Sequence, residues 1–131
     1  PMLPSTTTEQ DIPTHSLPPT RVCIQGGAGA FHEIAARKIF NGQPLEIVPA
    51  ITFRELIDKV EQQEEADLGI MAIENTIAGS ILFNYRLINE SKLRIISEVY
   101  LRIQQNLMAL PGEKIENLQE VHSHPVAIEQ C

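Results

Sequence analysis

The sequence predicts an α/β domain built on a mainly parallel sheet. Short apolar stretches alternate with amphipathic, helix-like stretches from Arg21 onward, and the links between them are short. Strand–helix–strand units close with right-handed crossovers and place consecutive strands parallel, so this order favours a sheet with helices on its faces. In such folds, ligands bind beyond the carboxyl ends of the strands. The loops at those ends are therefore where function is expected.

The first two strand–helix units are predicted from hydrophobic periodicity. Residues 22–25 form a short apolar strand that leads into the glycine-rich stretch 26–29. A helix follows, ends at Asn41-Gly42, and has apolar residues along one face: Phe31, Ile34, Ala35 and Ile39. Residues 45–48 form the second strand. The second helix begins with a Thr52–Glu55 capping box and has apolar residues at i, i+3, i+4 and i+7: Phe53, Leu56, Ile57 and Val60.

The rest of the chain continues the alternation. Residues 67–73 are nearly all apolar and predict a strand buried on both faces, after a charged run that is typical of a solvated helix end. A loop at 74–80 precedes a helix marked by Ile81, Tyr85 and Ile88. The long stretch 93–110 is expected to divide into two strands near 104–106. A short strand at 120–122 then leads to Pro125, which suits the first turn of a last helix.

Composition limits the classes of function. At 131 residues, with 43% hydrophobic and 21% charged residues, the chain has the balance of one soluble globular domain. Its net charge of −7 disfavours nucleic acid but permits a small anion held by local donors. Cys23 lies in an apolar strand and Cys131 is remote from it, so no disulfide framework is expected. Without a membrane-length apolar run or a secretory signal, a cytoplasmic protein is predicted. The Pro/Thr/Ser-rich residues 1–20 are expected to be a disordered leader.

Two strand-to-helix loops could bind an anion. The glycine-rich loop from Gly26 to His32 can bring backbone N–H groups and a helix start to a ligand, although a tight turn alone would also need glycine. It is neither a dinucleotide fingerprint nor a P-loop, which disfavours a nucleotide. In the second loop, Glu74 and Asn75 end a buried strand, where polar groups are costly unless they are hydrogen-bonded or face a cleft. The spacing leaves a catalytic and a structural role about even for Asn75, and it favours a structural role, as a helix N-cap, for Ser80.

A third loop, His122 to Pro125, invites a metal or nucleophile hypothesis. Alternate residues of a strand point to opposite faces, so His122 and His124 would not share a ligand, and no metal is expected. Cys131 lies about two helical turns after His124, which makes a Cys–His pair weak. Capping alone explains Ser123 equally well.

Taken together, the loops resemble the prephenate dehydratase family in order and spacing over residues 21–131. The landmarks are Ile24-Gln25-Gly26 with Gly29-Ala30-Phe31-His32-Glu33, then Ile73-Glu74-Asn75-Thr76 with Gly79-Ser80, then Ser123-His124-Pro125 with Gln130-Cys131. Ala30 and His32 stand where this family commonly has Ser or Thr. The resemblance implies a two-lobed α/β fold similar to type II periplasmic binding proteins, with prephenate between the lobes.

By position, the resemblance implies roles for individual residues. Those associated with catalysis are Asn75, Glu74, Gln130 and Ser123, and those associated with substrate binding are Gly29, Ala30, Phe31, Ser80 and His124. The implied lobes are 21–103 and the start of a second at 104–131. The enzyme would convert prephenate to phenylpyruvate in phenylalanine biosynthesis, without cofactor or metal, as a homo-oligomer.

In the family, a Thr-Arg-Phe or Thr-Arg-Asp motif with the proton-donating Thr, and an ACT-type domain that binds phenylalanine, would lie beyond Cys131. The 131-residue chain alone is therefore expected to be inactive, and self-associating because stretches such as 107–110 would be uncovered. Two alternatives stay open. One is a non-catalytic module of the same fold that binds a small carboxylate. The other is a nucleotide-binding α/β domain, which predicts affinity for a dinucleotide, and a titration that finds no such affinity would exclude it.

Overall fold

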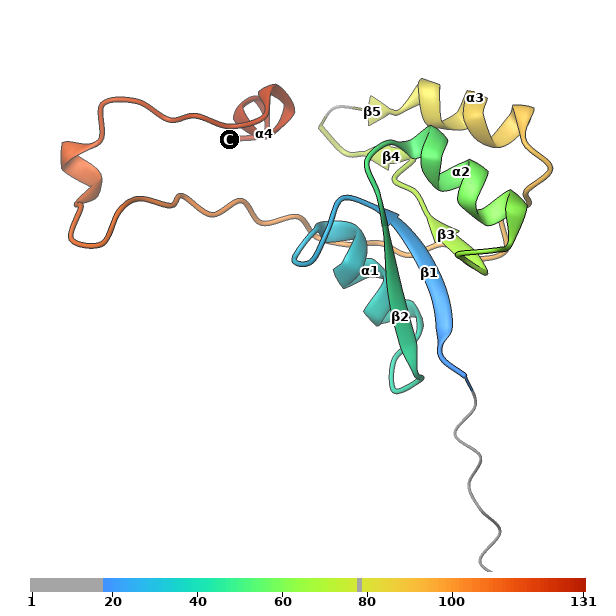
Figure 1. Cartoon of the computed structure of the whole chain (residues 1–131). Helices are drawn as coiled ribbons and strands as arrows, with labels where there is room; N and C mark the ends of the chain where they lie inside the picture. The colour runs from blue at the N-terminus through green and yellow to red at the C-terminus, as the bar shows by residue number, and fades with distance from the viewer. Residues whose placement is uncertain (1–17, 78) are drawn as a thin grey trace, which may run out of the picture.

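Three parallel strands form the sheet in the computed structural model, which describes residues 18–77 and 79–131 (Figure 1). They are β1 (Thr20–Gln25), β2 (Leu45–Ala50) and β3 (Leu68–Ile70), in the order β2-β1-β3. β1 is central: Thr20 to Gln25 pair with Leu45 to Ala50 on one side, and Val22 to Ile24 pair with Leu68 to Ile70 on the other. The predicted α/β class with a mainly parallel sheet is confirmed.

Alternating side chains of β1 divide the core between the two faces of the sheet. Val22 and Ile24 point to one face and pack with Ala36 of α1 (Phe31–Ile39), whereas Cys23 points to the other face. All three strand residues are fully buried. This is the two-residue period of an extended strand, applied to a strand with both faces covered.

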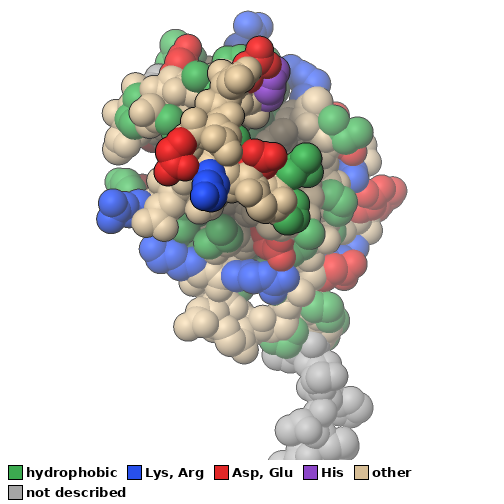
Figure 2. Space-filling model, turned by 90° about the vertical axis from the view of Figure 1, so that its left-hand side faces the viewer, with side chains coloured by type: hydrophobic (Ala, Val, Ile, Leu, Met, Phe, Trp, Pro, Cys, Tyr) green, Lys and Arg blue, Asp and Glu red, His purple; other side chains and the backbone are tan. Residues whose placement is uncertain are grey.

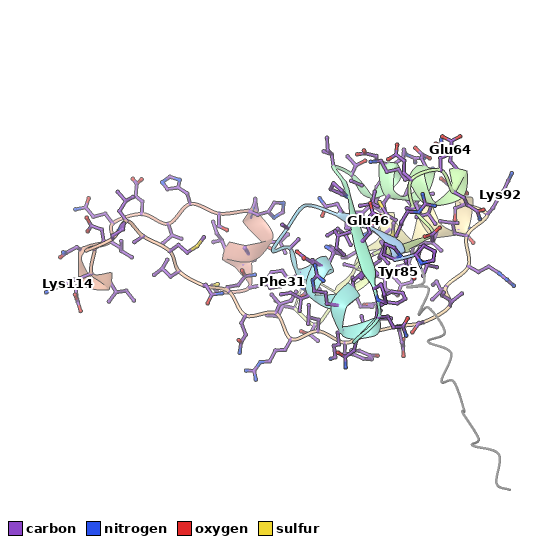
Figure 3. All side chains as sticks on the ribbon, turned by 60° about the horizontal axis from the view of Figure 1, so that its bottom comes forward. Phe31, Glu46, Glu64, Tyr85, Lys92 and Lys114 are labelled. Carbon is purple, nitrogen blue, oxygen red and sulfur yellow. The ribbon has the colours of Figure 1, made fainter. Side chains whose placement is uncertain are left out.

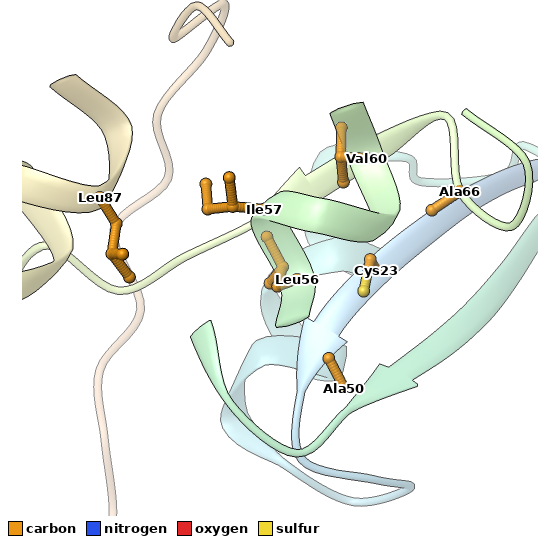
Figure 4. Packing of buried hydrophobic residues seen from close by; sticks show 7 residues of the cluster. All are labelled: Cys23, Ala50, Leu56, Ile57, Val60, Ala66 and Leu87. Atoms are coloured by element: carbon orange, nitrogen blue, oxygen red, sulfur yellow. The ribbon is translucent and has the colours of Figure 1, made fainter. Parts of the chain in front are cut away.

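The second face is covered by α2 (Phe53–Gln62), as its periodicity predicted. The Thr52 hydroxyl accepts from the Glu55 N–H at 3.1 Å, and the Glu55 carboxylate accepts from the Ile51 N–H at 2.7 Å, so the capping box is confirmed. Figure 4 shows that buried side chains of α2 lie between β1 and Leu87 of α3. One buried cluster contains Cys23, Ala50, Leu56, Ile57, Val60, Ala66 and Leu87.

An ion pair joins the starts of β1 and β3 to the end of α2. The Arg21 guanidinium contacts both oxygens of Asp67, at 2.9 and 3.2 Å, and donates to the carbonyls of Gln63 and Glu64 beyond the helix. The Arg21 N–H also donates to Asp67. The hydrogen bonds from Arg21 lower the pKa of Asp67 to about 2. Asp67 in the charged run 61–67 is therefore a structural residue that the prediction of a merely solvated helix end did not identify.

Two predicted faces differ from the observed ones. Helix α1 buries Ala35 and Ala36, while Phe31 and Ile34 of the predicted face are exposed, because small side chains let the helix approach the sheet. The strand predicted at 67–73 is only β3, and its outer edge carries no partner strand in the described residues. Leu68 and Ile70 are only half-buried and Gly69 is exposed, so the prediction of full burial on both faces is wrong for this strand.

The segment predicted as a loop at 74–80 contains a small hairpin. β4 (Glu74–Asn75) and β5 (Gly79–Ser80) pair antiparallel, and α3 (Leu82–Glu90) follows. The N-cap residue of α3 is Ile81, which makes no side-chain cap, so the prediction of Ser80 as N-cap is wrong. The buried residues of α3 are Asn84 and Leu87 rather than the predicted apolar set.

The strands predicted at 93–110 and 120–122 are absent. Residues 93–131, all of which the structure describes, contain only the 3₁₀ turn η1 (Ile115–Asn117) and α4 (Pro125–Glu129), with Pro125 at the helix start as predicted. A strand needs a neighbour to pair its backbone groups. The start of this segment passes beside the core, where Leu93 packs against the buried cluster of Cys23 and Leu87 and the Tyr100 carbonyl accepts from Lys38 Nζ at 2.8 Å, and only its later part extends away from the sheet (Figure 1). Figure 2, viewed from that side, shows apolar side chains between charged ones at the surface. Lys114 marks the far end of the excursion in Figure 3.

Three further expectations concern the chain as a whole. The predicted leader falls mainly on residues 1–17, which lie outside the described residues, and β1 already begins at Thr20. In the described part of the chain no helix is both long and apolar enough to cross a membrane. Cys23 and Cys131 are free thiols, which confirms that they form no disulfide, and burial raises the pKa of the Cys23 thiol.

Candidate functional site

The strand order places a natural ligand position between the carboxyl ends of β1 and β3. After β1 the chain crosses to α1 on one face, and after β3 it reaches α3, which packs with α2 on the other face. Adjacent strands whose connections depart to opposite faces leave a crevice at their carboxyl ends. The glycine-rich loop 26–30 and the hairpin 74–80 lie at this switch point, as the sequence predicted for both loops.

The glycine loop turns through two residues with left-handed backbone, Gly26 (φ 102°) and Gly29 (φ 85°). The Gly29 N–H donates to the Glu33 carboxylate at 2.7 Å, and Arg37 holds the other oxygen of Glu33 at 2.8 Å. The Gly29 N–H bond, followed by that of Arg37, lowers the pKa of Glu33. Glu33 therefore reaches back over the start of α1, where the positive end of the helix dipole stabilises its carboxylate.

Other donors of this loop face no protein acceptor. Within residues 18–77 and 79–131, no hydrogen bond is made by the N–H of Gly27 or of Ala28. Phe31 opens α1 beside them, at the position labelled in Figure 3, and Ala30 is its N-cap without a side-chain cap. In the first turn of α1 the Glu33 N–H donates to the Ala30 carbonyl at 3.0 Å, so only the leading amides of the helix lack an acceptor within it. The N–H groups of Gly27 and Ala28 are therefore available as hydrogen-bond donors.

Three side chains meet at the hairpin. The Glu74 carboxylate accepts from the Tyr85 hydroxyl at 2.6 Å and from the Ser80 hydroxyl at 2.9 and 3.1 Å. The hydrogen bond from Tyr85 is the largest cause that lowers the pKa of Glu74, and the bond from Ser80 is the second. The bond between Glu74 and Tyr85 also raises the pKa of Tyr85. Glu74 is therefore held as a carboxylate anion in one orientation.

Asn75 lies on the same hairpin beside Glu74. Its side-chain oxygen accepts from the Ile77 N–H at 2.9 Å, which is the geometry of an Asx turn. This bond fixes the amide oxygen within the turn. Because the amide group is planar, it also fixes the direction of the NH₂ group.

A side chain of α1 reaches the segment that leads to the hairpin. His32 Nε2 accepts from the Ala72 N–H at 3.3 Å, and its ring meets Phe53 edge-on with 5.6 Å between centroids. Burial lowers the pKa of His32, which favours the neutral ring needed to accept this bond. The helix that follows the glycine loop is thus joined directly to the strand end that precedes Glu74.

The third predicted group lies on and beside α4. His124 is the N-cap of α4, and its Nδ1 accepts from the Val126 N–H at 3.3 Å, so this histidine provides the cap considered for Ser123. Gln130 accepts from Gln105 at 3.1 Å. Figure 1 shows α4 on the side toward which β1 and β3 point. The hydrogen bonds shown for residues 104–131 join residues within that segment, so no contact of this kind brings Ser123, His124 or Gln130 to the hairpin.

Sequence reasoning did not identify Tyr85 and Asn84 as site neighbours, because the helical pattern placed Tyr85 on an apolar face. The sequence did contain a signal for the role of Glu33. Glu33 follows the N-cap residue Ala30 by three positions, as Glu55 follows Thr52, which is the position of the glutamate in a capping box. Across the described ranges, no three His, Cys, Asp or Glu side chains are grouped to hold a metal.

The chain is thus an α/β domain with unpaired glycine-loop amides and a fixed polar hairpin at the switch point of a parallel sheet, the position where such domains bind their ligands. The model of the prephenate dehydratase family matches residues 22–131, and the chain belongs to this family. It is 41% identical over 111 residues to arogenate dehydratase 2 of Petunia hybrida, covering 85% of this chain and 27% of that protein. It is 39% identical over 111 residues to arogenate dehydratase/prephenate dehydratase 1, chloroplastic, of Arabidopsis thaliana, covering 85% and 28%.

The chain spans about a quarter of the length of these relatives, and no solved structure matches it significantly. The prediction of a cytoplasmic protein is wrong, since relatives at 39% and 40% identity are named chloroplastic enzymes. That prediction relied on the lack of an apolar secretory segment, and plastid transit peptides are polar and Ser-rich instead.

Proposed function

We propose that this chain forms part of a dehydratase that converts prephenate to phenylpyruvate, releasing water and carbon dioxide. The observation that carries the proposal is that the family model covers residues 22–131 in a chain whose unpaired loop amides and Glu74–Asn75 hairpin follow the carboxyl ends of the neighbouring strands β1 and β3. Prephenate is a dianion, and amides at a helix start suit one of its carboxylates.

The reaction needs positioning and one proton. The bond from the ring to its carboxylate breaks, and the electron pair forms a new ring double bond as carbon dioxide leaves. The carbon–oxygen bond to the ring hydroxyl breaks at the same time, and the hydroxyl departs as water after it accepts a proton. Aromatisation drives both steps without a cofactor.

Glu74 is not the proton donor in this proposal. Its carboxylate already accepts from Tyr85 and Ser80, and its lowered pKa keeps it ionised at neutral pH. Its role is to fix the hairpin, while the Asn75 amide orients a ring substituent and Gly29, Ala30 and Phe31 shape the anion position. The donor in this proposal is the Thr of the Thr-Arg-Phe or Thr-Arg-Asp motif, elsewhere in the full-length enzyme.

The second half of the site is proposed to come from a second lobe that begins near residue 104, after a first lobe at 21–103. In such a two-lobed fold, similar to type II periplasmic binding proteins, Ser123, His124 and Gln130 face the hairpin across the cleft. The exposed side chains of residues 104–131, including Met108 at 87% exposure, support a segment that packs only within a larger assembly. The isolated chain is accordingly predicted to be inactive, and a homo-oligomer remains a prediction for the full-length protein.

The test uses a chimera in which residues 22–131 replace the matching segment of the Petunia hybrida arogenate dehydratase 2. Asn75→Asp keeps the oxygen that accepts from Ile77, removes the NH₂ donor and adds a negative charge, which the control variant must also add. Asn41→Asp, in the exposed turn after α1, is the matched control. Release of phenylpyruvate and carbon dioxide from prephenate is measured for each folded chimera, with arogenate supplied in parallel.

We expect turnover by the parent chimera and the Asn41→Asp control, and a loss of about 100-fold in kcat/KM for Asn75→Asp, the scale of removing one positioned donor. Turnover of arogenate alone would reassign the substrate within the same chemistry. A folded chimera that binds prephenate without releasing carbon dioxide would instead indicate a carboxylate-binding module. Equal kinetics of the two variants would reject the role of Asn75.

The chloroplastic names of the relatives favour a plastid as the location of the full-length protein. A fluorescent fusion of that protein, expressed in plant cells, should coincide with chlorophyll autofluorescence. Fluorescence spread through the cytosol would contradict this proposal.

A further inference from the structure

The segment between β3 and β4 has no strand partner, yet its central peptide is held from two sides. Residues 71–73 pair with no strand among the described residues. The Ala72 N–H donates to His32 Nε2 at 3.3 Å, and the Ala72 carbonyl accepts from Asn84 Nδ2 at 2.7 Å. Two side chains therefore replace the ladder that a longer strand would have supplied.

The two side chains come from opposite faces of the sheet. His32 belongs to α1, which packs against Val22 and Ile24, whereas Asn84 belongs to α3, whose Leu87 packs in the Cys23 cluster. The His32 ring is itself fixed by its edge-on contact with Phe53. Because Nε2 accepts, the proton of the neutral ring lies on Nδ1.

Asn84 carries a cost that its packing does not explain. It is fully buried, its amide nitrogen is used for Ala72, and its Oδ1 has no hydrogen-bond partner in the described structure. A buried acceptor without a partner lowers stability, so an apolar side chain would fill this position better if filling were its only role. The feature that requires an asparagine here is the bond to the Ala72 carbonyl.

We propose that His32 and Asn84 are positioning residues that hold the Ala72 peptide and thereby set the place of the Glu74–Asn75 hairpin relative to the glycine loop. This inference rests on the proposed function, because Asn75 is the group that is positioned. Ala72 lies two residues before Glu74, and the next carbonyl, of Ile73, accepts from the Ile81 N–H at 2.9 Å beyond the hairpin. The base of the hairpin is thus fixed on both of its strands.

The hydrogen bonds themselves are tested on the 131-residue chain by hydrogen exchange at the Ala72 amide. His32→Leu removes the acceptor, His32→Gln supplies one through its side-chain oxygen, and His122→Leu removes an exposed histidine that contacts Glu120 only. We expect exchange at Ala72 to rise roughly tenfold or more in His32→Leu and to stay near the wild-type rate in the other two. Unchanged exchange in His32→Leu would reject the bond.

The positioning role is tested in the chimera described above. His32→Leu and Asn84→Leu are expected to lower kcat by about tenfold or more with KM changed less than about threefold, because the displaced group acts on the reacting centre. His32→Gln should recover most of kcat, and the Asn41→Asp control should match the parent. Parent-like kcat in both leucine variants overturns the proposal. A folded parent chimera without activity overturns the proposed function instead, and Ala72 exchange still decides whether the two side chains hold the peptide.

Discussion

Gly69 of β3 is predicted to be intolerant of a methyl group, and the structure gives the magnitude. A Cβ built at Gly69 would lie 2.7 Å from Leu56 Cδ2 and 3.2 Å from Val60 Cγ2, whereas carbon atoms pack best at about 3.5–4.0 Å. Leu56 is only 2% exposed, so its side chain cannot move into solvent. Gly69→Ala must therefore displace α2 from the sheet or force Leu56 from its rotamer.

Two opposing effects determine the net change for Gly69→Ala. Overpacking of a tight core costs about 1–3 kcal/mol, whereas replacing glycine in a permitted conformation gains about 0.4–1 kcal/mol through the unfolded state. Gly69 is not among the glycines with positive φ, so this gain applies. We expect a net loss of about 1–2 kcal/mol in the free energy of unfolding, measured by urea denaturation of the 131-residue chain.

Gly27→Ala is the matched control, because its Cβ would meet no atom within 4 Å and its φ is not positive. It should be neutral or slightly stabilising. Combining Gly69→Ala with Leu56→Ala should cost less than the sum of the single changes, by about 1 kcal/mol or more, since removing Leu56 also removes the clash. Additive changes, or a Gly69→Ala variant as stable as Gly27→Ala, would refute the packing of α2 on β3.

Three further predictions follow from single contacts. Asp67→Asn should lower the urea midpoint near neutral pH. The lowered pKa of Asp67 means that its ionised carboxylate contributes stability, and this contribution is lost as pH falls from about 4 toward 2, so the difference from the wild type should vanish in that window. A difference that persists at pH 2 would contradict the Arg21 contact. Thr52→Ala should cost about 0.5–2 kcal/mol of unfolding free energy by removing the cap of α2, and an unchanged midpoint would argue against it. Tyr85→Phe should raise the pKa of Glu74 in a carboxyl NMR titration, by more than Ser80→Ala does, and the reverse order would show that the Tyr85 bond is secondary.

The elements that the sequence predicted correctly depend on local patterns. β1, α1 and α2 each combine a periodic run with a local start or stop, such as Thr52 with Glu55, so neighbours within a few residues specify them. The family resemblance likewise depended on short motifs at strand ends, and the family match confirmed it. These features need no knowledge of distant contacts.

The failures depend on partners that are distant in the sequence. Residues 93–110 have the composition of strands, but composition does not supply a neighbouring strand for pairing. The Glu74 cluster joins residues eleven positions apart, from Glu74 to Tyr85, and no period connects a hairpin to the middle of a helix. The bonds of Ala72 to His32 and Asn84 likewise join three separate elements.

The most direct measurement is a crystal structure of the chimera with an unreactive dicarboxylate analogue of prephenate. One carboxylate should accept hydrogen bonds from the amides of Gly27 and Ala28, and the ring should lie within reach of the Asn75 amide. An analogue bound away from the carboxyl ends of β1 and β3, with the glycine loop and the hairpin both untouched, would contradict the assignment of this crevice as the site.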